Sequence, residues 1–148
     1  MTSAAYSVHP ALAIAAEATL PALGLLAIVL PTIEWRAGRL KYPELFLLGS
    51  LVSFALVYII RYASHASGHW LGTGLRYSTH AAVAVSIGVT LAACRLSLLP
   101  AVAVLVAGYL WLITYLPYHT PGDVLSTIAV MLPLTLLCHL PRWRRGTG

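Results

Sequence analysis

A histidine and an aspartate four residues apart, His119 and Asp123, are the pair in this sequence best suited to chemistry. They lie in the segment Tyr115–Val124 between two apolar runs, and Asp123 is the only aspartate in the chain. Thr120 followed by Pro121 is typical of a helix start, with Thr120 as N-cap. His119 is then expected just outside the helix, within reach of Asp123. That carboxylate would fix the imidazole tautomer and make the other ring nitrogen a better nucleophile or base.

A second histidine, His80, occupies a matching position at the start of another apolar run. Ser78 is a good N-cap for this run, which would place His80 in the first turn of a helix. Free backbone N–H groups at a helix start favour anions such as phosphate. His80 beside a bound phosphate could protonate a leaving oxygen. If the two helices are neighbours, one phosphate could lie between His80 and His119.

The composition indicates what kind of scaffold must position these groups. The chain has 148 residues, of which 59% are hydrophobic and 9% charged, whereas soluble domains carry about 25% charged residues. We therefore expect an all-α integral membrane protein with a single domain spanning residues 1–148. The net charge of +5 is attributed to orientation in the membrane, and no nucleic acid partner is expected.

The chain offers about five stretches that could cross a bilayer as helices, each needing about 20 apolar residues. The expected transmembrane helices cover approximately residues 11–30, 45–62, 78–94, 97–116 and 123–140. A polar, basic connection is expected at 32–43 and a loop rich in Gly, Ser and His at 62–77. Pro21 should kink the first helix. Glu17 is an ionisable group inside it, for which a hydrogen-bonded helix-packing role is favoured over proton relay or substrate binding.

Five crossings place the connections on alternating sides and so sort the charged residues. One side receives seven basic residues, Arg36, Arg39, Lys41, Arg95, Arg142, Arg144 and Arg145, and the other receives only Arg61 and Arg76. By the positive-inside rule the basic side should be cytoplasmic. We expect a cell inner or plasma membrane protein with its N-terminus outside and its C-terminus inside.

The same sorting collects five histidines on the extracytoplasmic side, together with Asp123: His9, His65, His69, His80 and His119. Ionisable groups gathered at one mouth of a bundle predict a functional site. His65 and His69 have a spacing that lets two histidines bind one metal ion on a helix. A zinc-dependent membrane hydrolase that draws its ligands from this histidine cluster is therefore an alternative.

The two histidine segments resemble motifs of a known family. Tyr77-Ser78-Thr79-His80 resembles the Pro-Ser-Gly-His motif that opens a membrane helix in the type 2 phosphatidic acid phosphatase (PAP2) superfamily. His119-Thr-Pro-Gly-Asp123-Val resembles the final His-x-x-x-Asp motif of the superfamily. In form the two segments look most like the sphingomyelin synthase branch. The resemblance covers approximately residues 76–140 and implies a PAP2-like helical core.

The resemblance implies a lipid-phosphate phosphatase or phosphotransferase that uses no metal and no cofactor. Its substrate would be a lipid phosphate or lipid pyrophosphate, bound at the extracytoplasmic membrane face. His119 would attack phosphorus, Asp123 would orient His119, and His80 would protonate the departing alkoxide. Water or a second alcohol would then take the phosphoryl group. The phosphate-binding residues are expected to be Arg61, Arg76, Ser78 and Thr79.

Two departures from the superfamily shape this expectation. The final motif of the superfamily begins with Ser-Arg, and Leu112 and Ile113 hold the corresponding positions here. Phosphoryl transfer depends on electrostatic stabilisation, so Arg76 or Arg61 is expected to supply the missing charge. The superfamily core has six crossings, and this chain offers five. A non-catalytic PAP2-like protein that binds a lipid headgroup is a further alternative, and self-association into a homo-oligomer is left open.

Overall fold

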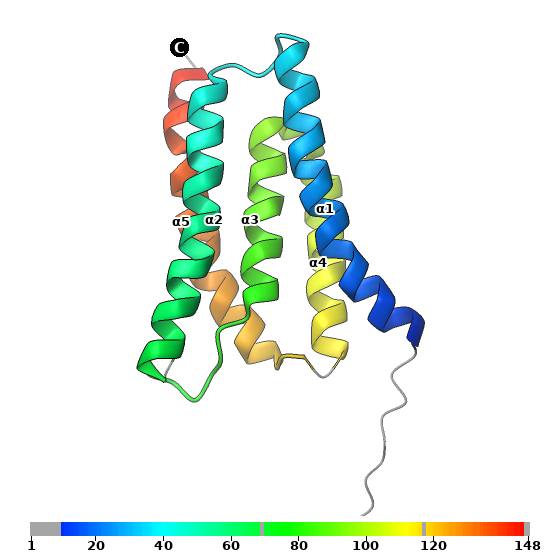
Figure 1. The fold of residues 1–148 in the computed structure, drawn as a ribbon, viewed down its shortest axis with the longest axis vertical. Helices are drawn as coiled ribbons and strands as arrows, with labels where there is room; N and C mark the ends of the chain where they lie inside the picture. The colour runs from blue at the N-terminus through cyan, green and yellow to red at the C-terminus, as the bar shows by residue number, and fades with distance from the viewer. Residues whose placement is uncertain (1–9, 69, 117, 147–148) are drawn as a thin grey trace, which may run out of the picture.

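Five α-helices make up the described part of the chain, residues 10–68, 70–116 and 118–146 of a computed structural model, with side chains between residues 11 and 142. The helices are α1 (Pro10–Arg36), α2 (Pro43–Ser67), α3 (Thr79–Cys94), α4 (Leu99–Tyr115) and α5 (Pro121–Gly146), and a short 3₁₀ turn, η1 (Leu96–Leu98), precedes α4. Successive helices run antiparallel, so their connections alternate between the two ends of the bundle (Figure 1).

Four segments of the described chain are long and apolar enough to cross a membrane: Ala11–Arg36, Pro43–Ser67, Leu96–Tyr115 and Pro121–Arg142. They indicate an integral membrane protein, as the composition predicted. The helix α3 has only 16 residues. At a rise of 1.5 Å per residue it is about 24 Å long, which is shorter than the hydrocarbon core of a bilayer, about 30 Å.

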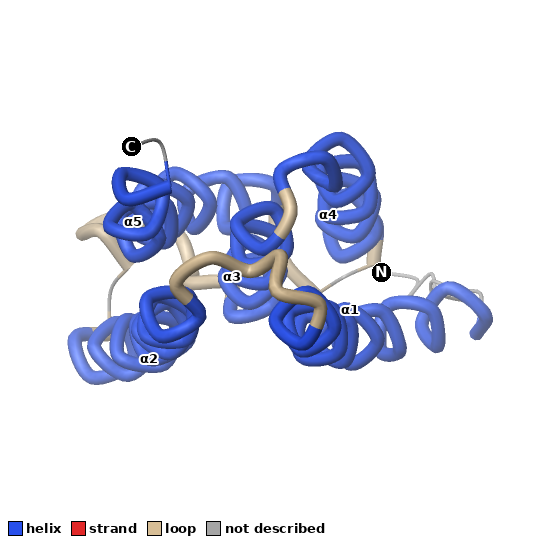
Figure 2. Tube along the Cα trace, turned by 90° about the horizontal axis from the view of Figure 1, so that it is seen from above, coloured by secondary structure: helices blue, strands red, loops and turns tan. Residues whose placement is uncertain are grey.

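The short helix α3 lies at the centre of the bundle, with the other four helices around it (Figure 2). Every residue from Ala84 to Cys94 is buried. Many of these side chains are small, which allows helices to approach closely in a membrane. A Cβ on Gly88 would lie 3.0 Å from a Val106 methyl of α4, so the glycine favours the close approach of these two helices. Protein therefore surrounds α3, and the outer helices carry the lipid-facing surface.

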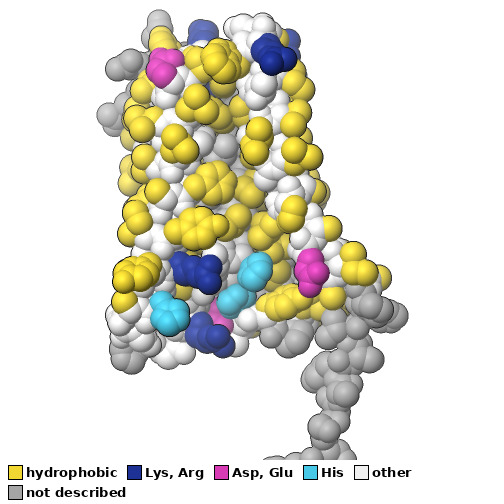
Figure 3. Space-filling model, in the orientation of Figure 1, with side chains coloured by type: hydrophobic (Ala, Val, Ile, Leu, Met, Phe, Trp, Pro, Cys, Tyr) yellow, Lys and Arg dark blue, Asp and Glu magenta, His cyan; other side chains and the backbone are white. Residues whose placement is uncertain are grey.

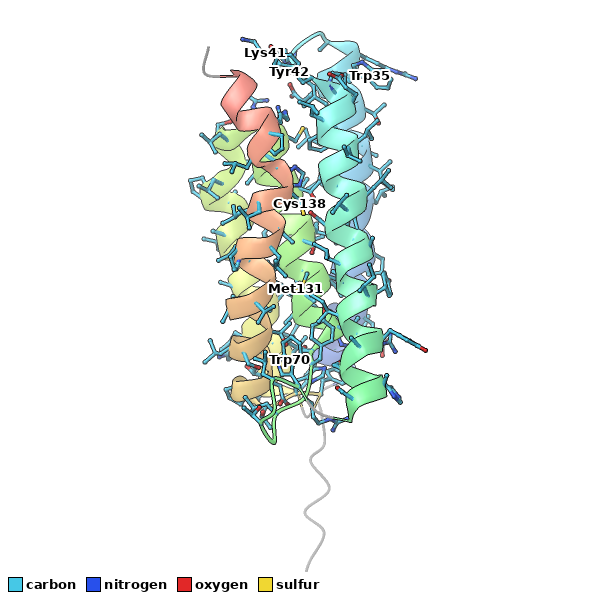
Figure 4. All side chains as sticks on the ribbon, turned by 90° about the vertical axis from the view of Figure 1, so that its left-hand side faces the viewer. Trp35, Lys41, Tyr42, Trp70, Met131 and Cys138 are labelled. Atoms are coloured by element: carbon cyan, nitrogen blue, oxygen red, sulfur yellow. The ribbon has the colours of Figure 1, made fainter. Side chains whose placement is uncertain are left out.

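The two ends of the bundle carry most of the charged side chains, with hydrophobic side chains between them (Figure 3). We call the end formed by the α2–α3 and α4–α5 connections the histidine end, because it holds His65, His80 and His119. The opposite end is called the arginine end and holds Arg36, Arg39, Arg95 and Arg142. Figure 4 places Lys41 at the arginine end, Trp70 at the histidine end, and Met131 between them.

The arginine end is held together by contacts between connections. Glu34 accepts a hydrogen bond of 2.7 Å from Arg39 Nε, and its carboxylate lies 3.5 Å from Arg95 Nη1. Arg142 donates to the backbone carbonyls of Lys41 and Ala93, so α5 is tied to the end of α3. The basic residues predicted to share one side therefore share one end, and the side chains of Arg144 and Arg145 lie outside the described residues.

Three helices extend beyond their predicted ends. The helix α1 continues to Arg36, α2 to Ser67 and α5 to Gly146, so the predicted connection at 32–43 and loop at 62–77 were both too long. The Ser64 hydroxyl bonds back to the Arg61 carbonyl at 2.9 Å within the added part of α2. Loss of hydrophobicity marks where a helix leaves lipid, whereas the helix itself continues until its hydrogen bonding is interrupted.

The helix α1 contains Pro21 and Pro31 in its interior. A proline inside a helix removes one backbone hydrogen bond and favours a kink. The first part of α1 leans away from the bundle in Figure 1. This lean separates the start of α1 from α2 at the histidine end.

Candidate active site

The start of α5 has the capping arrangement that the sequence predicted. The Thr120 hydroxyl accepts a hydrogen bond from Asp123 N at 3.2 Å, and the Asp123 carboxylate accepts one from Thr120 N at 3.0 Å. This reciprocal pair satisfies two backbone N–H groups that a helix start otherwise leaves without partners. His119 lies just before the cap, as expected.

Asp123 also joins the two histidine segments. Its second carboxylate oxygen accepts a hydrogen bond of 2.7 Å from Arg76 N, in the stretch that leads into α3. One turn further along α5, the Thr127 hydroxyl accepts from Ser78 N at 3.0 Å. Trp70 Nε1 donates to the Ser126 hydroxyl at 2.9 Å. Three hydrogen bonds from α5 thus hold the segment that carries His80.

Ser78 is the N-cap of α3, as predicted. Its side chain accepts a hydrogen bond from Ala81 N at 3.3 Å and is fully buried. The hydroxyl therefore caps the helix and does not face the space beside His80. Because this hydroxyl already caps α3, the geometry gives no support to the predicted role of Ser78 in binding phosphate.

The two histidines come together at the histidine end. The ring centroids of His80 and His119 lie 5.8 Å apart, with the ring planes at 60°. The Tyr118 ring stacks on the His80 ring at a centroid distance of 6.0 Å. A phosphate shared by the two imidazoles was predicted only if α3 and α5 are neighbours. The two helices do pack against each other.

His119 presents its two ring nitrogens to different surroundings. Its buried Nδ1 lies 4.0 Å from the Asp123 carboxylate, beyond hydrogen-bond range but on the carboxylate side of the ring. Nε2, on the opposite side of the ring, is therefore the candidate nucleophile. Burial lowers the pKa of His119 below its usual value; the positive charges of His80 and Arg76 lower it further, and Asp123 opposes them. The imidazole is thus neutral near pH 7, as a nucleophile must be.

A cavity of about 390 Å³ opens beside the two histidines, and its lining combines polar and apolar side chains: Leu20, Tyr58, Arg61, Thr79, His80, Val83 and His119. Arg61 and Thr79, both predicted to bind phosphate, therefore face the same space as the histidines. The Arg76 side chain is exposed and does not line this cavity. Figure 3 shows histidine and basic side chains gathered at this end of the molecule, between α2 and α1.

A second, smaller cavity of about 140 Å³ lies on the other side of His80, lined by Ala16, Glu17, His80, Tyr109, Ile113 and Tyr118. Glu17 lines this cavity and is exposed at the surface, and no hydrogen bond to a described residue supports the helix-packing role predicted for it. Ile113 occupies the position where the superfamily motif has arginine. Sequence reasoning missed that Glu17 and Ile113 are both at the site, although an ionisable residue within a membrane helix was a signal for Glu17.

The residues named for a zinc site do not form a ligand set in the part of the chain that is described. His65 is exposed in the last turn of α2, and His69 lies outside the described residues. Among residues 10–68, 70–116 and 118–146, no three His, Cys, Asp or Glu side chains are arranged to hold a metal ion. The geometry therefore gives the zinc alternative no specific support.

The site brings together two imidazoles, a buried carboxylate and a guanidinium group beside one cavity. These groups can carry out nucleophilic attack, proton transfer and charge stabilisation on a phosphate ester. Membership of the PAP2 superfamily stays a prediction that the two sequence motifs carry. No protein-family model matches the chain, and no curated protein and no solved structure matches it.

Proposed function

We propose that this protein is a membrane-bound phosphatase or phosphotransferase for lipid phosphates that forms a phosphohistidine on His119 and needs no metal. One observation carries the proposal. The ring centroids of His80 and His119 lie 5.8 Å apart, and both residues line a cavity that Arg61 also lines. A nucleophile and a proton donor must both reach the same phosphate group, and two neighbouring imidazoles that line one cavity meet this condition.

In the proposed first step, His119 Nε2 attacks phosphorus and an N–P bond forms. The bond from phosphorus to the leaving oxygen breaks, and His80 gives its proton to that oxygen. Asp123 lies on the Nδ1 side of His119 and stabilises the positive charge that develops on the ring. In the second step, water or an alcohol attacks phosphorus, the N–P bond breaks and restores His119, and His80 takes the proton from the attacking oxygen.

The transferred phosphoryl group carries negative charge that the site must stabilise. Arg61 and Thr79 line the cavity, and the start of α3 points its first backbone N–H groups toward the same end. Arg76 contributes its charge from the rim of the site. In this proposal Arg61 takes the part that arginine plays in the PAP2 motif, because Ile113 stands at that motif position.

The apolar part of the cavity suits a lipid substrate. Leu20 and Val83 form its walls on α1 and α3, within the membrane-crossing part of the bundle. A hydrocarbon chain could enter between these helices while its phosphate reaches the histidines. The positive-inside rule places this end on the extracytoplasmic face of the membrane, with the N-terminus outside and the C-terminus inside.

The proposal is tested by a phosphate-release screen on protein in lipid nanodiscs. Phosphatidic acid, polyprenyl phosphates and polyprenyl pyrophosphates are offered with and without a metal chelator. We expect at least one substrate to be cleaved equally well in both conditions, and His119→Ala to abolish its cleavage. His65→Ala is the matched control, because His65 is an exposed histidine at the same end that does not line the cavity.

Two results of this screen would contradict the proposal. If His119→Ala cleaves every substrate as fast as the unchanged protein, His119 is not the nucleophile. If chelation removes the activity and zinc restores it, the zinc alternative replaces the phosphohistidine mechanism. Detection of an acid-labile phosphoryl group on His119 by mass spectrometry, absent from the His119→Ala protein, would support the covalent step directly.

A further inference from the structure

His80 lies between two cavities of different character. The larger cavity contains Arg61 and His119, and the smaller one contains Glu17, Tyr109 and Tyr118. The lining of the first includes a positive charge and an apolar wall, whereas the lining of the second includes a glutamate and two tyrosines beside Ala16 and Ile113. The proposed reaction uses only the first cavity and leaves the second without a role.

We propose that the cavity lined by Glu17, Tyr109 and Tyr118 binds a small polar alcohol, which is the leaving group or the acceptor in phosphoryl transfer. This inference rests on the proposed function, because it assigns the two halves of a phosphate ester to the two sides of His80. The phosphorus lies with His119 and Arg61, and the alcohol oxygen lies where His80 can exchange a proton with it.

The lining of the smaller cavity suits hydroxyl groups. The Glu17 carboxylate accepts hydrogen bonds, and a phenol hydroxyl both donates and accepts them. An alcohol with several hydroxyl groups can therefore satisfy Glu17 and a tyrosine together. Such a partner would also offset the cost of placing the polar Glu17 side chain within a membrane-crossing helix.

The size of the smaller cavity limits the ligand. Its volume of about 140 Å³ is well below the 390 Å³ of the cavity beside His119. The buried side chains of Tyr109 and Ile113, which are 3% and 1% exposed, form part of its wall. A three-carbon polyol such as glycerol fits this space, whereas a lipid chain does not. The lipid half of a substrate is thus assigned to the larger cavity.

The substrate that fits both cavities is a phosphodiester that joins a lipid to a small alcohol. His119 Nε2 forms a bond to phosphorus while the bond from phosphorus to the small alcohol's oxygen breaks. His80 gives its proton to that oxygen, and the neutral alcohol departs through the smaller cavity. In the reverse direction, His80 takes the proton from an acceptor alcohol in this cavity as the alcohol oxygen attacks phosphorus, and the bond from phosphorus to His119 Nε2 breaks.

Binding is tested by nuclear magnetic resonance on protein in nanodiscs with ¹³C-labelled tyrosine rings, assigned through Tyr109→Phe and Tyr118→Phe. Glycerol is compared with 1-propanol, which has the same carbon number but one hydroxyl group. We expect glycerol to shift the Tyr118 signal and 1-propanol to leave it in place. Glu17→Leu should remove the shift, and Glu17→Gln should retain most of it because an amide oxygen also accepts hydrogen bonds.

The outcomes of this titration separate the ligand classes. Equal shifts with both alcohols, or no shift with glycerol, would overturn the inference. Loss of the shift in Glu17→Gln, together with a shift produced by ethanolamine alone, would overturn it in favour of a cationic ligand. Thermal unfolding of Glu17→Leu, a replacement that suits a membrane helix, checks that the variant is folded.

An activity measurement tests the same inference in a different way. With glycerol present, the ratio of glycerol transfer product to hydrolysis product should fall about fivefold in Glu17→Leu, the effect of losing one hydrogen bond. Total turnover should change much less. An unchanged ratio would contradict the alcohol site and leave the proposed function intact. Absence of any turnover would contradict the proposed function, and the tyrosine titration would still decide whether the cavity binds glycerol.

Discussion

Each end of the bundle buries one carboxylate, and the two are surrounded differently. Asp123 is 4% exposed at the histidine end and Glu34 is 5% exposed at the arginine end. Glu34 contacts two guanidinium groups, from Arg39 and Arg95. Asp123 accepts hydrogen bonds from backbone N–H groups and lies 4.0 Å from an imidazole. The two guanidinium groups neutralise the charge of Glu34. No arginine side chain pairs with Asp123 in the described residues, so the negative charge of Asp123 acts on the His119 imidazole.

The histidines at the two ends differ in the same way. His139, near the arginine end, is fully buried; it lies 3.5 Å from the Thr90 hydroxyl and packs against Phe46. His119 and His80 border cavities. The comparison shows that burial of a polar group near a membrane surface does not identify a site. At the histidine end, open space lies beside the titratable groups His80 and His119.

Asp123→Asn should produce the largest effect, because it removes the charge beside His119 and leaves one acceptor oxygen where two now accept from Arg76 N and Thr120 N. We expect phosphate release to fall about 10²-fold or more, the usual contribution of a positioned acid–base group. Steady-state kinetics would be measured beside Glu34→Gln, which changes a carboxylate of similar burial at the other end. Comparable activity losses in the two variants would contradict the view that only the carboxylate at the histidine end takes part in the reaction.

Gly49→Ala should give the largest loss of stability. A Cβ on Gly49 would lie 2.7 Å from the Cys138 carbonyl oxygen and 3.0 Å from His139 Nδ1, so α2 and α5 would have to separate. Overpacking of this kind costs about 1–3 kcal/mol. Reversible unfolding in detergent micelles measures it, and turnover per folded molecule should stay unchanged.

Gly122→Ala, at the histidine end, is the matched control for this stability measurement. Its Cβ would lie 2.9 Å from a terminal methyl of Leu75, and a side-chain end moves more easily than a backbone carbonyl. Gly122→Ala should therefore destabilise the protein less than Gly49→Ala. The reverse order would show that the arginine end is the more adaptable of the two.

The pH dependence of activity should reveal the charges around His119. Its lowered pKa sets the acid side of the pH profile: activity is lost as the pH falls through this pKa, at a midpoint below the usual histidine value of about 6.5. Arg76 lowers this pKa, so Arg76→Gln should move the midpoint to higher pH. An unchanged midpoint in pH–rate profiles would show that the charge of Arg76 does not affect the pKa of His119.

Glu34→Gln should have the smallest effect. The two arginines that contact Glu34 are more than half exposed, and water already screens such pairs. The variant should lower the midpoint of thermal unfolding slightly and leave phosphate release unchanged. A large fall in phosphate release with normal unfolding would show that the arginine end is coupled to catalysis.

Local patterns in the sequence predicted much of this molecule. Composition predicted a membrane helical bundle, and alternating connections sorted the basic residues onto one end. The caps at Ser78 and Thr120 were predicted because such caps depend on hydrogen bonds within three residues. The ends of α1, α2 and α5 were predicted too short, because hydropathy reports contact with lipid and does not report where helical hydrogen bonding stops.

The sequence by itself determined which residues could do chemistry and at which end of a helix each one lies. Tertiary structure alone decided that His80 and His119 meet, because contact between residues 39 positions apart depends on how α3 and α5 pack. It also decided that Ser78 is a buried cap, and that Glu17 and Ile113 border the site. These outcomes depend on helix rotation and spacing around α3, which small side chains along its whole length permit and no local motif encodes.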